Sequence, residues 1–258
     1  MKIIIIVEKY GGNCNRLFQS LHFHAYALDN KIIFFNPTLI GLLKFDNYFF
    51  YILDYLNNFF LKILSKIILF FSKTEELCLF FGKNNYIRLV KGWNFRANNL
   101  TLKYNKHLKQ FYSFKKKNLS KRSKSLINYF KEVKKQGKFI VGLHIRRGDY
   151  KSWNNGQFYF SYKFYNKIIQ NLKQKLIKEN KKPFFCIVSD ELIKENINYD
   201  FFSKGSWRED QLVLQCCDLL IGPPSTFTMW ASYLSQKPLI TLKSENDLNF
   251  NNQIICKG

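Results

Sequence analysis

Short apolar runs alternate along this chain with segments in which apolar residues recur every three or four positions. Runs rich in β-branched and aromatic residues predict buried strands over residues 3–7, 31–35, 139–145, 184–188, 219–222 and 239–242. Helical spacing of apolar positions predicts helices over residues 15–28, within 115–138, and over 158–176, 209–217 and 226–234. Strands that alternate with helices indicate an α/β fold, with a parallel sheet covered on both faces.

The first 35 residues read as one strand–turn–helix–strand unit whose turn contains Gly11 and Gly12. The turn lacks the further glycine of a dinucleotide-binding fingerprint and the lysine of a Walker motif, so it is an anion-facing candidate without a diagnostic pattern. Residues 37–114 are rich in aromatic and aliphatic side chains and are predicted to be irregular. We expect two domains, over residues 1–115 and 116–258.

Residues 48–71 resemble a membrane span more than any other segment. Charged residues such as Asp54, Lys62 and Lys66 argue against a span, because a central charge is costly in a bilayer. Apolar residues recur at helical intervals, which favours an amphipathic helix. The helix either packs on the protein core or rests on an anionic bilayer surface with its lysines at the headgroups.

Composition adds a strong positive charge. The 258 residues include 41 Lys and Arg against 18 Asp and Glu, a net charge of +23. This excess suits an anionic partner such as nucleic acid, a membrane surface or a phosphorylated substrate, although a compositional bias toward Lys, Asn, Ile, Phe and Tyr also explains it.

Cysteine usage and the N-terminus bear on localisation. The six cysteines form no C-x-x-C pair and are predicted to be reduced and mostly buried, which is typical of the cytosol. The apolar run at residues 3–7 is too short for a signal-peptide core. We expect a cytoplasmic protein, with peripheral contact at the inner face of a membrane as the alternative.

Polar side chains gather where three predicted strands end. They are His144, Arg146, Arg147 and Asp149 after the strand at 139–145, Asp190 after 184–188, and Ser225 and Thr226 after 219–222. The carboxyl ends of parallel strands share one sheet edge, so these groups should converge. Two guanidiniums there indicate a phosphate site, because each donates paired hydrogen bonds to anionic oxygens.

Several of these side chains have two interpretations. Ser225 and Thr226 begin a predicted helix, whose free amides suit a phosphate, or Ser225 simply caps that helix. Asp190 either accepts hydrogen bonds from a base or sugar, or caps the next turn. Asp149 either orients an arginine or acts as a general base, and its position beside two cations favours the pairing role.

A metal site has little support in the sequence. His22 and His24 lie two residues apart on a predicted helix and therefore point to different faces, which favours packing over metal ligation. No Asp-x-Asp triplet occurs, so cationic side chains would have to stabilise the charge of a leaving diphosphate.

At these residues the chain resembles the GDP-fucose-dependent fucosyltransferases, and most closely the bacterial α-1,2-fucosyltransferase family. His144-Ile145-Arg146-Arg147-Gly148-Asp149-Tyr150 matches that family's H-x-R-R-G-D-Y motif without a mismatch. Gly11-Gly12-Asn13-Cys14-Asn15-Arg16-Leu17-Phe18-Gln19 is similar to G-G-L-G-N-Q-x-F-Q, with three departures at the third, fourth and sixth positions. Looser likenesses occur at Cys217-Asp218 with the Gly222 to Phe227 stretch, and at Lys91-Gly92-Trp93.

The resemblance implies two Rossmann-like domains of the GT-B glycosyltransferase type and an inverting enzyme that needs neither metal nor cofactor. The donor, GDP-fucose, would be held mainly by the C-terminal half. By motif position Arg146 would bind the diphosphate and stabilise departing GDP. The other residues implied are Asp149 in the catalytic site, His144 and Asp190 near guanine or ribose, Arg147 as a further substrate contact, Ser225 and Thr226 at the phosphates, and Asn15 from the N-terminal half.

The resulting prediction is a fucosyltransferase that moves fucose from GDP-fucose onto a hydroxyl of an oligosaccharide or lipid-linked glycan, in an α-1,2 linkage. Two alternatives stay open. A basic nucleic-acid-binding protein would use the +23 charge, but the lysines are spread throughout the chain, so no nucleic acid is expected as a partner. An inactive relative would bind the nucleotide-sugar or glycan without transfer.

Overall fold

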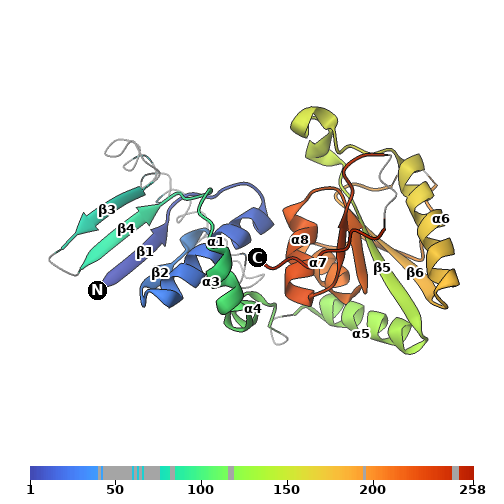
Figure 1. Cartoon of the computed structure of the whole chain (residues 1–258), viewed down its shortest axis with the longest axis horizontal. Coiled ribbons are helices and arrows are strands. Elements are labelled where there is room, and N and C mark those ends of the chain that lie inside the picture. The colour runs from blue at the N-terminus through green and yellow to red at the C-terminus, as the bar shows by residue number, and fades with distance from the viewer. Residues whose placement is uncertain are drawn as a thin grey trace. The chain divides into compact units, whose positions relative to one another are not determined.

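The computed structural model describes residues 1–39, 42, 60, 63, 66, 76–81, 85–115, 119–193, 196–245 and 250–258. The chain forms two compact units (Figure 1). The first comprises Met1–Asn118 with Lys257–Gly258, and the second comprises Leu119–Cys256.

The N-terminal unit contains a four-stranded sheet in the order β2-β1-β4-β3. Its strands are β1 (Lys2–Ile6), β2 (Ile33–Phe35), β3 (Glu76–Phe80) and β4 (Tyr86–Val90). β1 pairs in parallel with β2 and β4, and β3 is antiparallel to β4. Helix α1 (Asn13–Asp29) links β1 to β2, which confirms the strand, helix and strand predicted for the first 35 residues.

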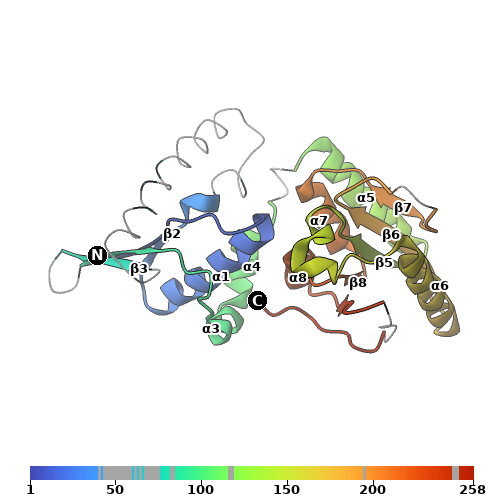
Figure 2. The same cartoon turned by 90° about the horizontal axis from the view of Figure 1, so that it is seen from above.

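Helix α1 covers this sheet through its apolar positions. Phe23 packs on Ile4, Ile6 and Val90 in one buried cluster. Two shorter helices, α3 (Asn98–Lys103) and α4 (Asn105–Tyr112), contact α1, and Figure 2 shows them near it. The apolar face of α1 is therefore covered by its own unit.

The prediction that residues 37–114 are irregular is wrong for the part that the structure describes. This region supplies a 3₁₀ turn η1 (Pro37–Leu39), β3, β4, α3 and α4. The strands of this region were not predicted because they lack a clear alternation of buried apolar and exposed polar residues. In β3, Leu79 and Phe80 are exposed, so apolar residues face both solvent and protein. The amphipathic helix predicted over residues 48–71 lies outside the described residues, apart from Phe60, Ile63 and Lys66, which are helical and exposed.

The C-terminal unit contains a five-stranded, fully parallel sheet in the order β7-β6-β5-β8-β9. Its strands are β5 (Lys138–Ile145), β6 (Lys182–Ser189), β7 (Phe201–Ser203), β8 (Leu219–Gly222) and β9 (Leu239–Thr241). Its helices are α5 (Lys121–Lys135), α6 (Tyr162–Lys178), α7 (Trp207–Cys216) and α8 (Thr226–Ser235). Every strand and helix predicted here is present, whereas three-residue β7 was too short to show a period.

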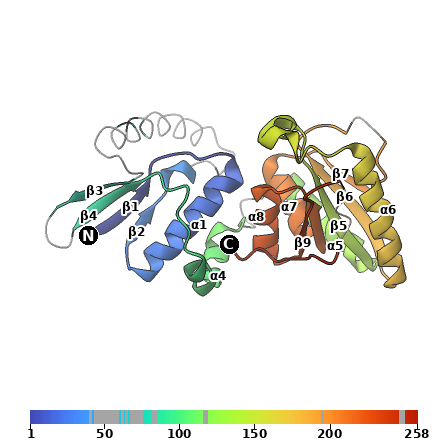
Figure 3. The same cartoon turned by 45° about the horizontal axis from the view of Figure 1, so that its top comes forward.

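Both faces of this sheet are covered, as predicted. Val141, Leu143 and Ile145 belong to a buried cluster with α6, while Ile140 belongs to a second cluster with α5, α7 and α8. Figure 3 shows α6 on one side of the strands and α7 and α8 on the other. Alternation along β5 thus places His144 on the same face as Ile140, toward α7 and α8.

Serine caps fix where the helices begin. Ser120 caps α5, and Ser161 caps α6. Ser206 forms a capping box with Glu209 at α7, and Ser225 caps α8. The caps of α7 and α8 follow β7 and β8, so both helices present their N-termini at the carboxyl edge of the parallel sheet.

The cysteines behave as predicted, because all six are free thiols. Cys14, Cys186, Cys217 and Cys256 are buried, and Cys78 is exposed. No helix within the described part of the chain is long and apolar enough to cross a bilayer.

Candidate active site

Arg146 directly follows the carboxyl end of β5, and its guanidinium lies between two carboxylates. Its Nη2 lies 2.7 Å from Oδ1 of Asp149, and its Nη1 lies 3.2 Å from Oδ2 of Asp190. About a third of its side chain, 32%, is exposed. The guanidinium is therefore held in a defined orientation, yet part of it remains open to an incoming anion.

Asp190 connects the ends of neighbouring strands β6 and β5. Its Oδ1 accepts a hydrogen bond of 2.8 Å from the backbone N–H of Arg147, while Oδ2 faces Arg146. A Cβ at Gly148 would lie only 2.7 Å from that Oδ2, so a larger residue here would displace the Asp190 carboxylate. Because both oxygens of Asp190 are engaged by these two arginines, the side chain fixes the chain that follows β5. The contact of Asp190 with guanine or ribose stays a prediction.

Tyr150 joins the arginine to the start of α8. Its hydroxyl donates to the carbonyl of Pro224 and is hydrogen-bonded to Ser225, while the Arg146 guanidinium lies 5.6 Å from the ring centroid. Burial raises the pKa of the Tyr150 hydroxyl, which moves it further from ionisation at neutral pH. Groups from the β5 and β8 ends thus converge, as the parallel sheet predicted.

The N-terminus of α8 shows the capping interpretation of its serine. Ser225 caps the helix, because its Oγ accepts a hydrogen bond of 3.2 Å from the backbone N–H of Phe227. Thr226 is the first helical residue and is half-buried. The positive end of the helix dipole therefore points toward the edge that carries Arg146. The phosphate contacts of Ser225 and Thr226 stay predictions.

His144 lies beneath this edge rather than on it. The side chain is only 2% exposed, and its Nδ1 lies 2.7 Å from Oγ1 of Thr228 in α8. Burial and then the charge of Arg146 lower the pKa of His144 to about 3, so the imidazole is neutral. Gly222 makes room for it, since a Cβ there would lie 3.0 Å from Cβ of His144. The geometry favours a supporting role for His144.

Arg147 contacts a different set of residues from Arg146. Its Nη1 donates a 2.8 Å hydrogen bond to the carbonyl of Phe160. Its guanidinium lies 3.7 Å from the ring centroid of Tyr159 and 4.5 Å from that of Tyr162. Such cation–π contacts are stabilising when desolvated, so the geometry favours a role in fixing the loop before α6. The predicted substrate contact of Arg147 is not tested by this arrangement.

Asn15 belongs to the N-terminal unit, near the start of α1. Gly11 has a φ of +59°, and a Cβ there would clash with the Asn15 side-chain amide. Arg16, a departure from the family motif, donates to the carbonyl of Thr38 at 3.0 Å and to Asn13. The side chains that follow the glycine turn are therefore engaged in contacts within the N-terminal unit. The role predicted for Asn15 stays a prediction.

The sequence interpretation missed Asp210 in the first turn of α7. Its Oδ1 accepts a 2.5 Å hydrogen bond from the Ser203 hydroxyl at the end of β7, and burial raises the pKa of this carboxyl to about 6. The capping-box spacing of Ser206 and Glu209 could have revealed the helix start that brings Asp210 to this sheet edge.

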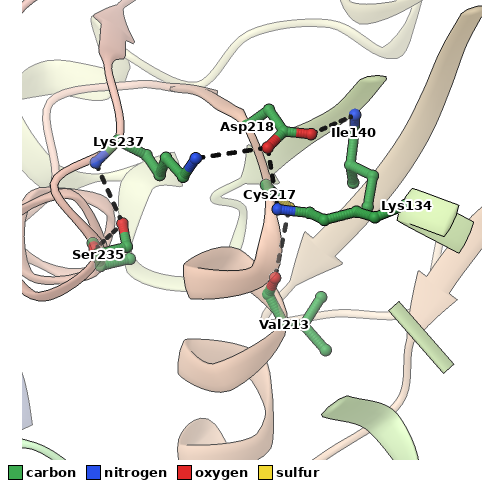
Figure 4. A network of polar contacts seen from close by, with 8 residues as sticks. Lys134, Ile140, Val213, Cys217, Asp218, Ser235 and Lys237 are labelled. Atoms are coloured by element: carbon green, nitrogen blue, oxygen red, sulfur yellow. Dashed lines mark hydrogen bonds and ion pairs between the residues drawn. The ribbon is translucent and has the colours of Figure 1, made fainter. Parts of the chain in front are cut away.

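Asp218 lies at the opposite, amino end of the strands, although it belongs to a motif with a likeness near the phosphates. One oxygen accepts a 3.0 Å hydrogen bond from the N–H of Ile140. The other faces Nζ of Lys134 at 2.9 Å and Nζ of Lys237 at 3.4 Å (Figure 4). Only the Gly222 to Phe227 part of that motif reaches the candidate site. Asp218 fixes the starts of β5 and β8.

The histidines of α1 are packing residues, as predicted. His22 accepts a 3.1 Å hydrogen bond from the N–H of Ala97, and the rings of Phe34 and Phe111 surround His24. Across the described residues, no group of three or more His, Cys, Asp or Glu side chains could hold a metal ion.

These histidines predict that the protein loses stability in mild acid. Burial lowers the pKa of His22 and of His24 to about 4, and that of His144 to about 3. Below pH 6.5 the unfolded chain therefore binds more protons at these sites than the folded chain does, and the free energy of unfolding falls. Asp210, with its pKa raised to about 6, opposes this with one group.

We expect urea unfolding to show a loss on the order of 1 kcal/mol per pH unit between pH 6 and pH 4.5. Replacing His22 by Asn should flatten that slope, because asparagine takes up no proton in this pH range. The variant should still fold, since its amide oxygen can accept the hydrogen bond from the Ala97 N–H. An unfolding free energy that is constant or rises toward pH 4.5 would contradict the neutral, buried imidazoles.

Comparison with known proteins places these features in a family. The model of the family described as "Glycosyl transferase family 11" matches residues 82–255. Arabidopsis thaliana FUT1, solved as the R284K mutant in complex with GDP, has 13% sequence identity and a TM-score of 0.52 over 96% of this chain and 71% of that chain. The fucosyltransferase NodZ from Bradyrhizobium has 13% identity and a TM-score of 0.50 over 94% of this chain and 96% of that chain.

A search of curated proteins finds no match. The structural likenesses confirm the predicted α/β fold of the GT-B type. The family match covers well over half of the chain and includes β5, Arg146 with its partners Asp149 and Asp190, and α8. The chain therefore belongs to glycosyl transferase family 11, and the resemblance to fucosyltransferases drawn from its sequence motifs is confirmed.

Proposed function

We propose that this protein is an inverting fucosyltransferase that moves fucose from GDP-fucose onto a glycan hydroxyl in an α-1,2 linkage. The observation that carries the proposal is Arg146, a partly exposed guanidinium that two carboxylates hold at the carboxyl edge of a parallel sheet. Ligands of open α/β sheets bind at this edge. GDP, present in the solved complex of the plant FUT1 mutant, is a ligand with the charge such a site would bind.

The chemistry requires a group that stabilises the departing diphosphate. Negative charge grows on the phosphate oxygens as the bond to fucose breaks, and a fixed cation favours that state over the bound donor. Arg146 meets the requirement because its orientation is set before the donor binds. The amide end of α8, beside Ser225 and Thr226, would add hydrogen-bond donors for the same phosphates.

Asp149 supports Arg146 in this proposal. Its side chain is 60% exposed and its Oδ1 is paired with the arginine, so it is poorly placed to act as a strong base. The acceptor is an oligosaccharide or a lipid-linked glycan. The net charge of +23 would suit a lipid-linked acceptor at an anionic membrane surface, reached from the cytoplasm.

Thermal unfolding tests the donor part of the proposal. GDP at about a hundredfold excess over its Kd should raise the Tm by roughly 5 °C in EDTA, because a ligand specific to the folded state stabilises it. UDP and ADP at the same concentration should give a smaller shift. No shift with GDP would overturn the proposed donor, especially if a single-stranded oligonucleotide bound with steep salt dependence instead.

Transfer itself needs a second readout. With GDP-fucose alone, slow release of GDP and free fucose should be measurable, and a saccharide acceptor should convert the fucose into a glycoside. The anomeric configuration of that glycoside, read by NMR, tests inversion. GDP binding without any donor cleavage would identify an inactive relative.

A further inference from the structure

Two aromatic rings form a tight stack at the carboxyl edge of the N-terminal sheet. Tyr10, in the turn after β1, and Trp93, in the segment after β4, have ring centroids 4.4 Å apart and an interplanar angle of 9°. Tyr10 is 42% exposed, and Trp93 is half-buried. Because β1 and β4 are parallel neighbours, their ends present both rings at one edge.

The segment that carries Trp93 is fixed along its length. The carbonyl of Lys91 accepts a hydrogen bond from the buried side chain of Gln19, and Lys91 Nζ lies 3.5 Å from Glu8. Gly92 has a φ of +51° and contacts Phe23 so closely that a Cβ would overlap the ring. Further along, Phe95 stacks on the same ring with centroids 4.4 Å apart. A surface that is held this firmly loses little conformational entropy when it binds a ligand.

Polar groups flank the stack. The guanidinium of exposed Arg96 lies 5.1 Å from the ring centroid of Trp93, and its Nη1 donates to the carbonyls of Trp93 and Phe95. Asn94 is exposed beside it. An aromatic face bordered by amide and guanidinium donors matches a pyranose ring, which has an apolar C–H face and hydroxyls around its rim.

We infer that the Tyr10–Trp93 stack is a binding platform for a pyranose ring of the glycan acceptor. The inference rests on the proposed function for the identity of the acceptor. A nucleic-acid strand would also stack on aromatic rings, but its phosphates need free cations. Here Lys91 is already paired with Glu8, whose carboxylate would also repel a phosphate group. The surroundings of the stack therefore favour an uncharged ligand.

Saturation-transfer NMR on the full chain, with lactose and N-acetyllactosamine as probes, tests the platform directly. The wild-type chain should transfer saturation to the sugar C–H protons. Tyr10→Ala and Trp93→Ala should lose most of that signal and raise the acceptor KM about tenfold, since aromatic contacts of this kind contribute up to about 1.5 kcal/mol. Tyr10→Phe, which keeps the ring, should stay within about twofold of wild type.

Tyr129→Ala is the matched control. Tyr129 is also 42% exposed and also touches a second aromatic ring, that of Phe201, but it lies on α5 of the other unit. Its saccharide signal and acceptor KM should match wild type. In every variant the Tm shift caused by GDP should persist, which shows that the fold and the donor site are intact.

The outcomes separate this inference from the proposed function. A saccharide signal that survives Tyr10→Ala and Trp93→Ala, or the lack of any signal in the wild type, overturns the platform even if GDP stabilises the protein. Sugar binding that depends on both rings supports it even if GDP has no effect. Competition for the rings by a single-stranded oligonucleotide, with no response to either sugar, would assign the stack to nucleic acid instead.

Discussion

Replacing Arg146 with alanine should abolish the thermal shift caused by GDP and lower the transfer rate by about a hundred- to a thousandfold. Arg146 is the partly exposed cation at the carboxyl end of β5, and its guanidinium is oriented before any ligand arrives. Its loss removes the preformed charge that favours the departing diphosphate. Differential scanning fluorimetry with GDP and a GDP-release assay measure the two effects.

Arg88 provides a matched control for this substitution. It is also an arginine at a strand, its side chain is also 32% exposed, and it is also paired with a carboxylate, that of Glu76. It lies in the N-terminal sheet, so Arg88→Ala should keep the full GDP shift. If Arg146→Ala bound GDP as tightly as the wild type, the proposed phosphate site would have to be abandoned.

Asp190→Ala should lower kcat by roughly ten- to a hundredfold, an effect typical of residues that orient a functional group. The substitution frees one side of Arg146 and leaves the N–H of Arg147 without its acceptor. Asp190→Asn should recover part of the rate, because its amide oxygen can still accept from that N–H. A role in binding guanine would instead raise the KM for GDP-fucose and leave kcat near wild type.

Two further variants sharpen the interpretation of Asp190. Gly148→Ala should mimic its loss, since the new methyl group would push against Oδ2 of Asp190. Asp218→Ala is the control, because Asp218 binds the N–H of Ile140 at the other end of β5 and also pairs with cations. It should reduce stability at least as much as Asp190→Ala while kcat stays near wild type. Equal losses of kcat in both would mean that the effect is only structural.

The elements of the C-terminal unit could be predicted from sequence because their signals are local. Each strand there is a short apolar run, and helices such as α6 carry an apolar stripe at helical spacing. The N-terminal unit was harder beyond β2. Exposed apolar side chains such as Leu79 and Phe80 blur the difference between buried and solvated faces, so β3 and β4 showed no clear period.

The convergence of the site residues at one sheet edge could be predicted from the order of strands and helices, but the contacts of their side chains could not. Parallel strands bring Arg146, Asp190 and Ser225 to one edge whatever their side chains do. The direction of each side chain depends on residues distant in the chain. His144 is turned inward by Thr228, and Arg147 is held by Tyr159 and Tyr162.

The sequence by itself determined the α/β class, the order of the C-terminal elements and the sheet edge where charge gathers, because these follow from local periodicity and from the motif around Arg146. The tertiary structure alone decided which arginine two carboxylates hold, which one packs on tyrosine rings, and that Tyr10 stacks on Trp93. Two of these pairs are far apart in the sequence, Arg146 and Asp190 by more than forty residues and Tyr10 and Trp93 by more than eighty. Their contact depends on strand pairing and helix packing, which no local pattern encodes.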